Sequence, residues 1–291
     1  MSVQKILVTG ANGQLGWELA QLKDQFVSFE FIFADRSQID LSKPASFEKI
    51  IEHISPDVII NTAAYTAVDK AESEKELASI INTTAVRELA RISKQKGIIF
   101  ITFSTDYVFN GKANSPYLPN TPLHPVNAYG ETKAAGELSA LKENENTIII
   151  RTSWVFSSHG NNFVKTMLRL MKERASLNVV GDQQGRPTYA KDLAIATMKI
   201  VVSIKEGKSL KGIFHYANQG ETTWFGFAEK IKEIAQLNCT LHSITTEQFP
   251  TPAPRPAYSV LDTLKIETDL GITIPHWEHA LQSCIDQIKK G

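Results

Sequence analysis

The 291-residue chain has little cysteine and no excess of charge of either sign. Its 31 Lys and Arg residues balance 31 Asp and Glu residues, so no basic field offsets a phosphate backbone, and nucleic acid is not expected as a partner. Cys239 and Cys284 are the two cysteines. They are too few for a disulfide framework and are not spaced as metal ligands, so we interpret them as packing residues. The seven histidines form no HxH or HExxH pair, and no metal site is predicted.

Long hydrophobic runs are also missing. Nowhere do about 18 consecutive apolar residues occur, the length that a membrane-spanning helix needs. The start of the chain, MSVQKILVTG, lacks the basic stretch and apolar run of a secretory signal. We therefore expect a soluble protein of the cytoplasm with no membrane partner.

Short apolar runs instead alternate with helix-length segments through the first half of the chain. This alternation is typical of a Rossmann-like, doubly wound parallel sheet covered by helices on both faces. Ser42 and Pro44 are expected to start a helix that Pro56 stops, and Gly97 is expected to close the longest one. The predicted strands are 5–10, 29–35, 57–61, 98–104 and 147–153, and the predicted helices include 17–24, 41–54, 76–96, 161–174 and 192–206.

The glycines of TGANGQLG follow the first predicted strand and open a helix. Gly10 permits a tight turn, Gly13 lets backbone approach a pyrophosphate, and Gly16 allows close packing of helix on strand. Gln14 and Leu15, within the same turn, are further candidates. The helix N-terminal amides then face the anion of a dinucleotide. A plain strand-to-helix turn is the alternative interpretation.

Further candidates for cofactor binding lie at the ends of the next two strands. Asp35 can accept hydrogen bonds from an adenosine ribose, whereas Arg36 can neutralise a 2′-phosphate, so the choice between NADH and NADPH stays open. Asp40 and Leu41 are assigned to the adenine, or to a loop that starts a helix. Small residues after the third strand would let the dinucleotide lie against the sheet edge; the candidates there are Ala63, Ala64 and Tyr65.

Tyr129 and Lys133 form a YxxxK pair in NAYGETKAAGE. Residues four apart share a helix face, and a nearby ammonium together with a nicotinamide cation would stabilise the tyrosine anion. Such a tyrosine can exchange a proton with a carbonyl oxygen as hydride moves. Ser104 and Thr105 end the preceding strand, where a hydroxyl can hold the same oxygen. Asn82 is interpreted either as a tie from the long helix to a catalytic water or backbone carbonyl, or as an exposed residue.

Together these ordered blocks resemble the extended short-chain dehydrogenase/reductases, and among them the dTDP-4-dehydrorhamnose reductase family. The resemblance spans nearly the whole chain, which makes it more specific than any one motif. It rests on TGANGQLG, NTAAYTAVDKAESE, STDYVFNG, NAYGETKAAGE, RTSWVFSSHGNNFVKTMLRL, DQQGRPTYAKDLA and TPAPRPAYSVLDTLK. It implies Tyr129 as proton donor, Lys133 on the nicotinamide ribose, and Thr105 and Asp106 near the sugar carbonyl.

The same resemblance places Trp154 against the deoxysugar, although from the residues alone an indole at a strand end is more often core. Asp106 has the alternative of capping the loop into Tyr107. Asn162, at the start of a helix, is a candidate for the nucleotide-sugar or a simple N-cap. Arg186 and Arg255 are candidates for its diphosphate, or ordinary surface arginines.

Two departures from the family limit what carries over. Some members form dimers through a metal held on glutamates; Glu18 matches one such ligand, but Lys191 stands where a second acid is needed. Related sugar-nucleotide dehydratases have the sequence Thr-Asp-Glu at this place, whereas this chain has Tyr107 after Asp106. The first departure argues against a metal-bridged dimer, and the second argues against loss of water and leaves net reduction.

The predicted organisation is an NAD(P)-binding domain over residues 1–155, with elements returning to it near 186–216, and a smaller, mixed substrate-binding region over 156–291. The expected reaction is reduction of the C4 ketone of a dTDP-sugar, dTDP-4-dehydro-6-deoxy-L-mannose, by NADPH or NADH. Two alternatives stay open: a sugar-nucleotide 4-epimerase, and a non-catalytic regulatory subunit of methionine adenosyltransferase. A homodimer is considered, and the proline-rich segment 249–260 either closes over the substrate or crosses the surface.

Overall fold

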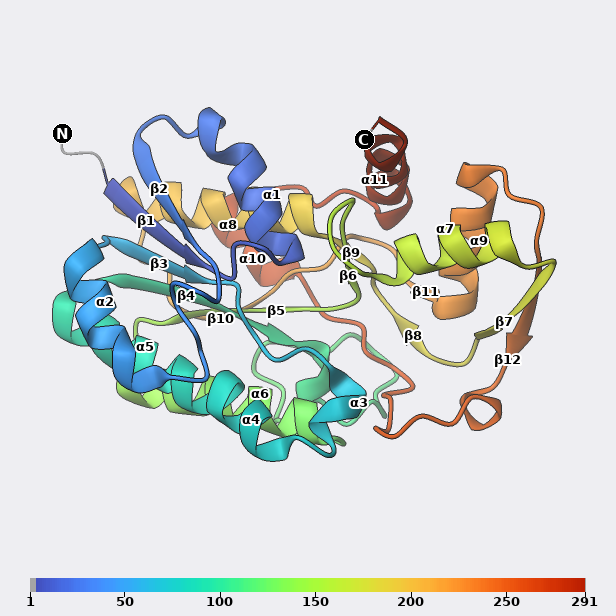
Figure 1. Ribbon diagram of the computed structural model, residues 1–291, viewed down its shortest axis with the longest axis horizontal. Helices are drawn as coiled ribbons and strands as arrows, with labels where there is room; N and C mark the ends of the chain where they lie inside the picture. Colours follow the sequence, from blue (N-terminus) through green and yellow to red (C-terminus); the bar gives the residue numbers. More distant parts are fainter. Residues whose placement is uncertain (1–3, 291) are drawn as a thin grey trace.

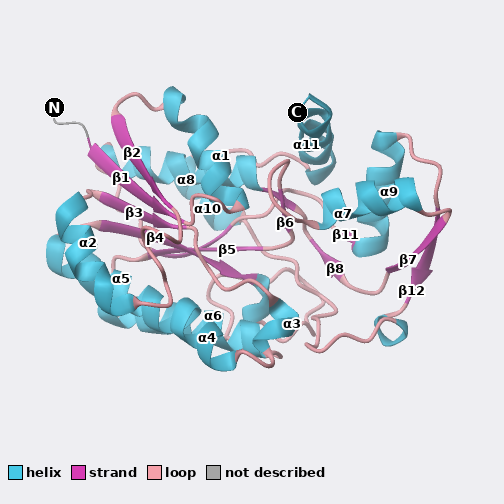
Figure 2. Ribbon diagram, in the orientation of Figure 1, coloured by secondary structure: helices cyan, strands magenta, loops and turns pink. Residues whose placement is uncertain are grey.

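A six-stranded parallel sheet forms the larger part of the computed structural model, which describes residues 4–290 (Figures 1 and 2). The strand order is β10-β5-β4-β3-β1-β2, and every neighbouring pair is parallel. The order reverses between β1 and β3, which is where doubly wound folds open a ligand crevice. The predicted fold class is therefore confirmed. The strands are β1 (Gln4–Thr9), β2 (Phe29–Ala34), β3 (Val58–Asn61), β4 (Ile99–Thr105), β5 (Ile148–Thr152) and β10 (Gly212–His215).

Helices cover both faces of this sheet (Figure 1). Along β1, Ile6 and Val8 belong to one apolar cluster and Leu7 to another, because successive side chains point to opposite faces. The first cluster includes residues of α1 (Gln14–Leu22), α8 (Ala190–Lys205) and α10 (Leu264–Leu270). The second includes residues of α2 (Phe47–Ile54), α5 (Ala85–Lys96) and α6 (Ala128–Glu143).

The helix boundaries depart from the sequence prediction in two places. The long helix expected over 76–96 is α4 (Lys75–Ser79) and α5, joined by a π-helical turn at Ile80–Thr84; it follows the short helix α3 (Val68–Ala71). Gly97 ends it in a left-handed conformation, φ 68°, as predicted. Ser42 does not start α2, because a 3₁₀ turn at Pro44–Ser46 precedes the helix and the Ser42 hydroxyl donates to Asp40 at 2.8 Å.

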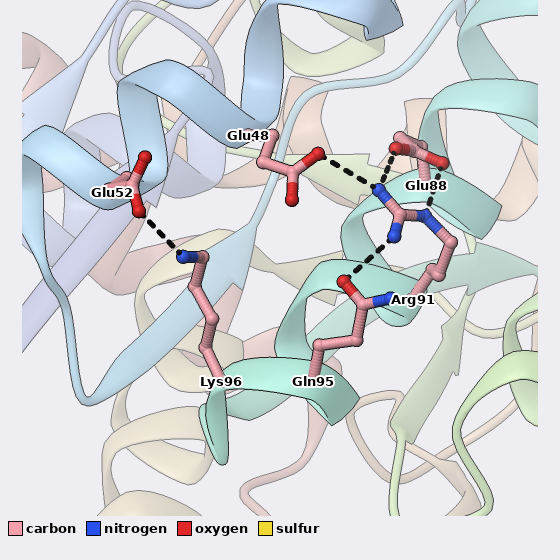
Figure 3. Close-up of polar contacts among 6 residues, drawn as sticks. All are labelled: Glu48, Glu52, Glu88, Arg91, Gln95 and Lys96. Carbon is pink, nitrogen blue, oxygen red and sulfur yellow. Dashed lines mark hydrogen bonds and ion pairs between the residues drawn. The ribbon is translucent and has the colours of Figure 1, made fainter.

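Polar side chains join α2 to α5 on the outside of the sheet (Figure 3). Arg91 donates to both oxygens of Glu88, at 2.6 and 3.0 Å, and to Glu48 on α2 at 3.4 Å. Lys96 reaches Glu52 at 3.5 Å. These are exposed pairs, each worth about 0–1 kcal/mol, so the apolar cluster between the helices and the sheet dominates their attachment.

A third apolar cluster lies beyond the carboxyl ends of the sheet strands. Its core contains both cysteines, which are buried free thiols. Within the described chain no helix is long and apolar enough to cross a membrane. The elements here are α7 (Phe163–Glu173), α9 (Trp224–Ala235) and α11 (Trp277–Lys290), with the strand pairs β7 (Ser176–Val180) and β12 (Thr240–Ile244), β6 (Val155–Phe156) and β9 (Thr188–Tyr189), and β8 (Gln184–Gly185) and β11 (Thr222–Thr223).

The proline-rich segment 249–260 crosses between the two parts of the molecule. Asn127 donates to the Pro254 carbonyl at 2.8 Å, and the Ala253 amide donates to Asp69 at 3.2 Å. Farther along, the Ser259 amide donates to the Gln184 carbonyl at 2.8 Å. The segment is thus held both on the N-terminus of α6 and on β8.

Candidate active site

The glycine turn between β1 and α1 has no space for side chains at its key positions. Gly10 has φ +73°, and a Cβ there would lie 2.7 Å from the Ala63 nitrogen. A Cβ on Gly16 would lie 2.4 Å from the Gly10 carbonyl oxygen. Gly13 is the N-cap of α1, which begins at Gln14, and its amide donates to the Gly10 carbonyl at 2.9 Å. The α1 amides are therefore left open toward an anion.

A cavity of about 550 Å³ lies over this turn and the carboxyl ends of β1, β3, β4 and β5. Its volume is typical of a cofactor site. Of the predicted residues, it is lined by Gly10, Gly13, Gln14, Leu15, Arg36, Asp40, Leu41, Ala63, Ala64, Tyr129 and Lys133. Gly16, Asp35 and Tyr65 are not among the lining residues. Gly16 acts in packing instead, as its contact with Gly10 requires.

The charged residues that follow β2 differ in their surroundings. Asp35 accepts hydrogen bonds from the Ser37 hydroxyl at 2.6 Å and amide at 2.8 Å, and from Asn12 at 3.3 Å. The bonds from Ser37 hold the pKa of Asp35 below its ordinary value. The side chain of Arg36 is 76% exposed and lies 3.5 Å from Asp40. That Asp35 binds the adenosine ribose stays a prediction. Arg36 and Asp40, in contrast, line the cavity.

Asn82 ties the loop after β3 to α6. It is 1% exposed, accepts from the Tyr65 amide at 2.9 Å and donates to the Tyr65 carbonyl at 3.0 Å and to Thr132 on α6 at 3.1 Å. The tie to a backbone carbonyl is thus correct, and the exposed alternative is wrong. The Tyr65 hydroxyl donates to Glu74 at 2.8 Å, and neither residue lines the cavity.

Tyr129 and Lys133 lie on α6, whose N-terminus is capped by Asn127, an acceptor for the Gly130 amide at 2.8 Å. The Lys133 ammonium donates to the Phe103 carbonyl on β4 at 2.6 Å. Burial lowers the pKa of Lys133 to about 8 and raises the pKa of Tyr129. At neutral pH Tyr129 is therefore a phenol, the form that can donate a proton. Lys133 alone does not stabilise the tyrosine anion that the sequence led us to expect.

Thr105 and Asp106 form a buried polar pair at the end of β4. The Thr105 hydroxyl donates to Asp106 at 2.9 Å and accepts from the Tyr107 amide at 3.2 Å. Thr105, rather than Asp106, therefore caps the turn into Tyr107, and the capping alternative for Asp106 is wrong. Burial raises the pKa of Asp106 to about 6. The Tyr107 ring packs edge-on against Tyr129, with centroids 5.7 Å apart.

Trp154 lies between β5 and β6 with a left-handed backbone, φ 46°. Its indole stacks on Trp224, with centroids 3.7 Å apart, and is half-buried. A Cβ on Gly185 would lie 2.6 Å from this ring. The side chain thus belongs to an aromatic stack and still keeps exposed surface, so both of its predicted roles are compatible with its position.

The remaining substrate candidates are already paired within the chain. Asn162 caps α7 by accepting from the Lys165 amide at 3.1 Å, and its amide donates to Gln14 at 2.9 Å. Arg186 lies 3.5 Å from Glu221 and donates to the Leu261 carbonyl at 3.1 Å. Arg255 pairs with Asp69 at 2.8 Å. Asn162 is therefore an N-cap, as one interpretation predicted, and it also contacts the glycine turn.

Glu18 does not present a surface carboxylate. It is 1% exposed and accepts from the Ser157 hydroxyl at 2.7 Å, and burial raises its pKa. Within residues 4–290, no three His, Cys, Asp or Glu side chains gather where they could hold a metal ion.

Several lining residues were missed by the sequence reasoning. Asn12 lies inside the glycine motif and could have been included from its position alone. Thr152 ends β5, where a hydroxyl does not differ in sequence from a core residue, whereas Ser104 at the end of β4 was predicted and does line the cavity. Gly160 and Asn161, which also line the cavity, come from a loop far along the chain.

Known proteins of similar sequence and structure match this chain over nearly its whole length. The RmlD substrate binding domain family matches residues 4–290. The dTDP-4-dehydrorhamnose reductase of Burkholderia thailandensis is 41% identical over 293 residues, covering 97% of this chain and 98% of that protein. The crystal structure of a dTDP-4-dehydrorhamnose reductase from Clostridium acetobutylicum is 38% identical with a TM-score of 0.93, covering 98% of this chain and 100% of that one. That of Bacillus anthracis, solved in complex with NADP, is 36% identical with a TM-score of 0.93 and the same coverage.

Proposed function

Because the chain belongs to the dTDP-4-dehydrorhamnose reductase family, we propose that it reduces the C4 ketone of dTDP-4-dehydro-6-deoxy-L-mannose to dTDP-L-rhamnose with NADPH or NADH. The observation that carries this proposal is that the glycine turn, Tyr129 and Lys133 line one cavity. A helix end suited to an anion and a candidate proton donor thus face the same crevice. Tyr107 after Asp106 further supports net reduction over dehydration.

The cavity fits a dinucleotide, which supplies the hydride when bound. Gly10, Gly13, Gln14 and Leu15 would hold its pyrophosphate with backbone of the turn and of α1. The adenosine would lie by Asp35, Arg36, Asp40 and Leu41, and Ala63 and Ala64 leave room along the sheet edge. Tyr65 supports that loop through its backbone bonds to Asn82.

Tyr129 is the proposed proton donor to the C4 oxygen. Its raised pKa keeps the phenol protonated, and positioned acid catalysis of this kind is worth about 10² to 10⁴ in rate. Lys133 is proposed to hold the nicotinamide ribose, and Thr105 to donate to the same carbonyl oxygen. The Thr105 hydroxyl has one proton, which it donates to Asp106 at 2.9 Å in the free protein, so it would turn from the carboxylate to the substrate oxygen when the sugar binds.

Residues 1–155, with the elements near 186–216, are proposed to bind the cofactor, and the rest of 156–291 to bind the sugar nucleotide. Trp154 would pack against the deoxysugar with the face that Trp224 leaves exposed. Arg186 and Arg255 would turn from Glu221 and Asp69 toward the diphosphate, while Asn162 links the two parts through Gln14.

The test follows NADPH and NADH absorbance with purified protein and the keto-sugar nucleotide generated in place by upstream enzymes. Oxidation of the cofactor matched by dTDP-L-rhamnose supports the reductase and gives its cofactor preference. A 4-epimerase would interconvert sugar nucleotides with no net cofactor consumption. Protein that binds both cofactors, turns over neither and forms a stable complex with methionine adenosyltransferase would instead be a regulatory subunit.

A further inference from the structure

A buried ion pair lies directly behind the catalytic face of α6. Glu137 follows Lys133 by one helical turn and Tyr129 by two, so the three side chains share one side of the helix. Glu137 and Arg151 are 2% and 1% exposed. Arg151 donates from Nε to the carboxylate at 2.9 Å and from Nη2 at 2.7 Å. This is the bidentate geometry that gives an arginine–carboxylate pair its directional specificity.

The guanidinium is held from its other sides as well. It donates to the Pro119 carbonyl at 3.0 Å, lies 3.2 Å from Nε2 of His215, and sits over the Phe109 ring at 5.1 Å from the centroid. Burial, together with the charge of Arg151, lowers the pKa of His215 to about 3, so this imidazole stays neutral. The cluster therefore contains one cation and one anion.

This cluster connects α6 to the strand ends under the cavity. Arg151 lies opposite Ser104 in the β4–β5 register, and the next pair is Thr105 with Thr152. Ser104, Thr152 and Lys133 all line the cavity. A shift of the ion pair would therefore move the proton donor relative to the hydroxyls at the strand ends.

Stability alone gives little reason for such a pair. Replacement of a buried ion pair by apolar side chains of similar volume is often neutral or stabilising, because desolvation of two charges offsets their attraction. At this position, however, the carboxylate also acts on Lys133. Burial lowers the pKa of that lysine, and the charge of Glu137 acts in the opposite direction.

Other charged groups around α6 have their own partners or face solvent. Asp106 is bonded to Thr105, Asp69 to Arg255, and Glu72 to the Ala128 amide. Tyr107 is a neutral phenol beside Tyr129, since burial raises its pKa. The charged side chains of α4, α5 and α6 that lie in exposed positions are Lys75, Glu76, Arg87, Lys94, Lys96, Glu131 and Lys142.

We propose that Glu137 and Arg151 are positioning residues of the active site: their buried pair fixes α6 on β5 and keeps Lys133 positively charged. The expected effect on kcat/KM rests on the proposed function. The effect of Glu137 on the charge of Lys133 concerns the free protein and does not depend on that function. Neither residue touches the cavity, so they act through Lys133 and Tyr129.

The test compares three variants with the parent protein. Glu137→Gln keeps the shape of the side chain and removes its charge. Glu137→Gln combined with Arg151→Met removes both charges, so that no buried cation is left unpaired. Glu131→Gln, on the exposed side of the same helix, is the matched control. Circular dichroism and urea unfolding establish that each variant is folded.

The first readout is the titration of Lys133 in protein carrying ¹³C at the lysine ε-carbon, with Lys133→Arg assigning its signal. The midpoint should move to lower pH in Glu137→Gln, move by a smaller amount in the double variant because loss of the Arg151 charge acts in the opposite direction, and stay in place in Glu131→Gln. A neighbouring opposite charge shifts a pKa by about 1 or more. At about pH 8 the parental lysine is about half charged, so kcat/KM should fall about fivefold relative to the parent, with a smaller loss at about pH 6.5.

An unchanged Lys133 midpoint in the folded double variant, with parental kcat/KM at both pH values, would overturn the proposal and leave the pair as part of the core. If the parent protein itself fails to oxidise NADPH or NADH, the proposed function fails, while the lysine titration still decides the electrostatic claim. Equal loss of kcat/KM at both pH values with an unmoved midpoint would refute the charge effect on Lys133 and therefore the proposal as stated.

Discussion

Replacement of Asp106 by Asn should stabilise the protein at neutral pH. The carboxyl group is 2% exposed and accepts one hydrogen bond, from Thr105 at 2.9 Å. Its second oxygen has no hydrogen-bond partner among residues 4–290. Burial raises the pKa of Asp106 from the ordinary 3.8 to about 6. At neutral pH the folded protein therefore contains a carboxylate in an environment that favours the protonated acid.

The size of the effect follows from proton linkage. A rise in pKa from 3.8 to about 6 lowers the free energy of unfolding by ~3 kcal/mol at pH values above the folded-state pKa. The folded state holds its proton more tightly than the unfolded state, so this cost develops as the pH rises from about 4 to about 6, and roughly half of it is present at about pH 5. Asn lacks the charge but buries an unpaired amide N–H, which costs ~1 kcal/mol. The net gain for Asp106→Asn is then ~2 kcal/mol near pH 7.5.

Urea unfolding of both proteins at about pH 7.5 and about pH 5 measures this difference. The advantage of the variant should narrow by ~1 kcal/mol at the lower pH, because the parent regains its proton there. Turnover should fall in the same variant, as is common when an active-site charge is removed for stability. A variant less stable than the parent at pH 7.5, or an advantage that does not change with pH, would refute the reasoning.

Three further substitutions separate the proposed roles. Tyr129→Phe should lower kcat by about 10² or more with an unchanged Kd for NADPH; turnover near the parental rate would remove this phenol from the mechanism. Trp154→Ala should raise KM for the sugar nucleotide while cofactor affinity stays constant, and an equal effect on both ligands would mean that the indole supports the fold only. Arg36→Ala should weaken NADPH binding about tenfold or more and NADH binding little, since the 2′-phosphate loses a cation; equal losses, measured by fluorescence titration, would contradict that contact.

Local features of the sequence were sufficient to predict five of the six strands of the sheet, and β10 was not among them. Strands buried on both faces appear as short continuous apolar runs, and the five that were predicted match β1 to β5 to within a residue or two at each end. The turn between β1 and α1 was equally readable, because its glycines are required by local backbone contacts. That Tyr129 and Lys133 lie on one helix could be predicted, because both their spacing and their helical pattern are local properties.

Contacts between distant segments could not be predicted in this way. Arg255 and Asp69 are 186 residues apart in sequence, and neither carries a local sign of its partner. Asn82 lies in a π-helical turn, which a regular helical pattern does not reveal, so its tie to a backbone carbonyl was one of several alternatives and Tyr65 was not identified as the partner. The pairing of Glu137 with Arg151 likewise depends on how α6 packs on β5, and in sequence the two residues resemble any exposed acid and base.

Transfer of label from the cofactor to the sugar tests the central claim most directly. The protein would be supplied with the keto-sugar nucleotide and with NADPH carrying deuterium at C4 of the nicotinamide, in each of its two stereochemical forms. The account predicts that one form gives dTDP-L-rhamnose with deuterium at C4 of the sugar, in amounts equal to the NADPH oxidised. A sugar product without deuterium from either form, or one formed without NADPH consumption, would contradict it.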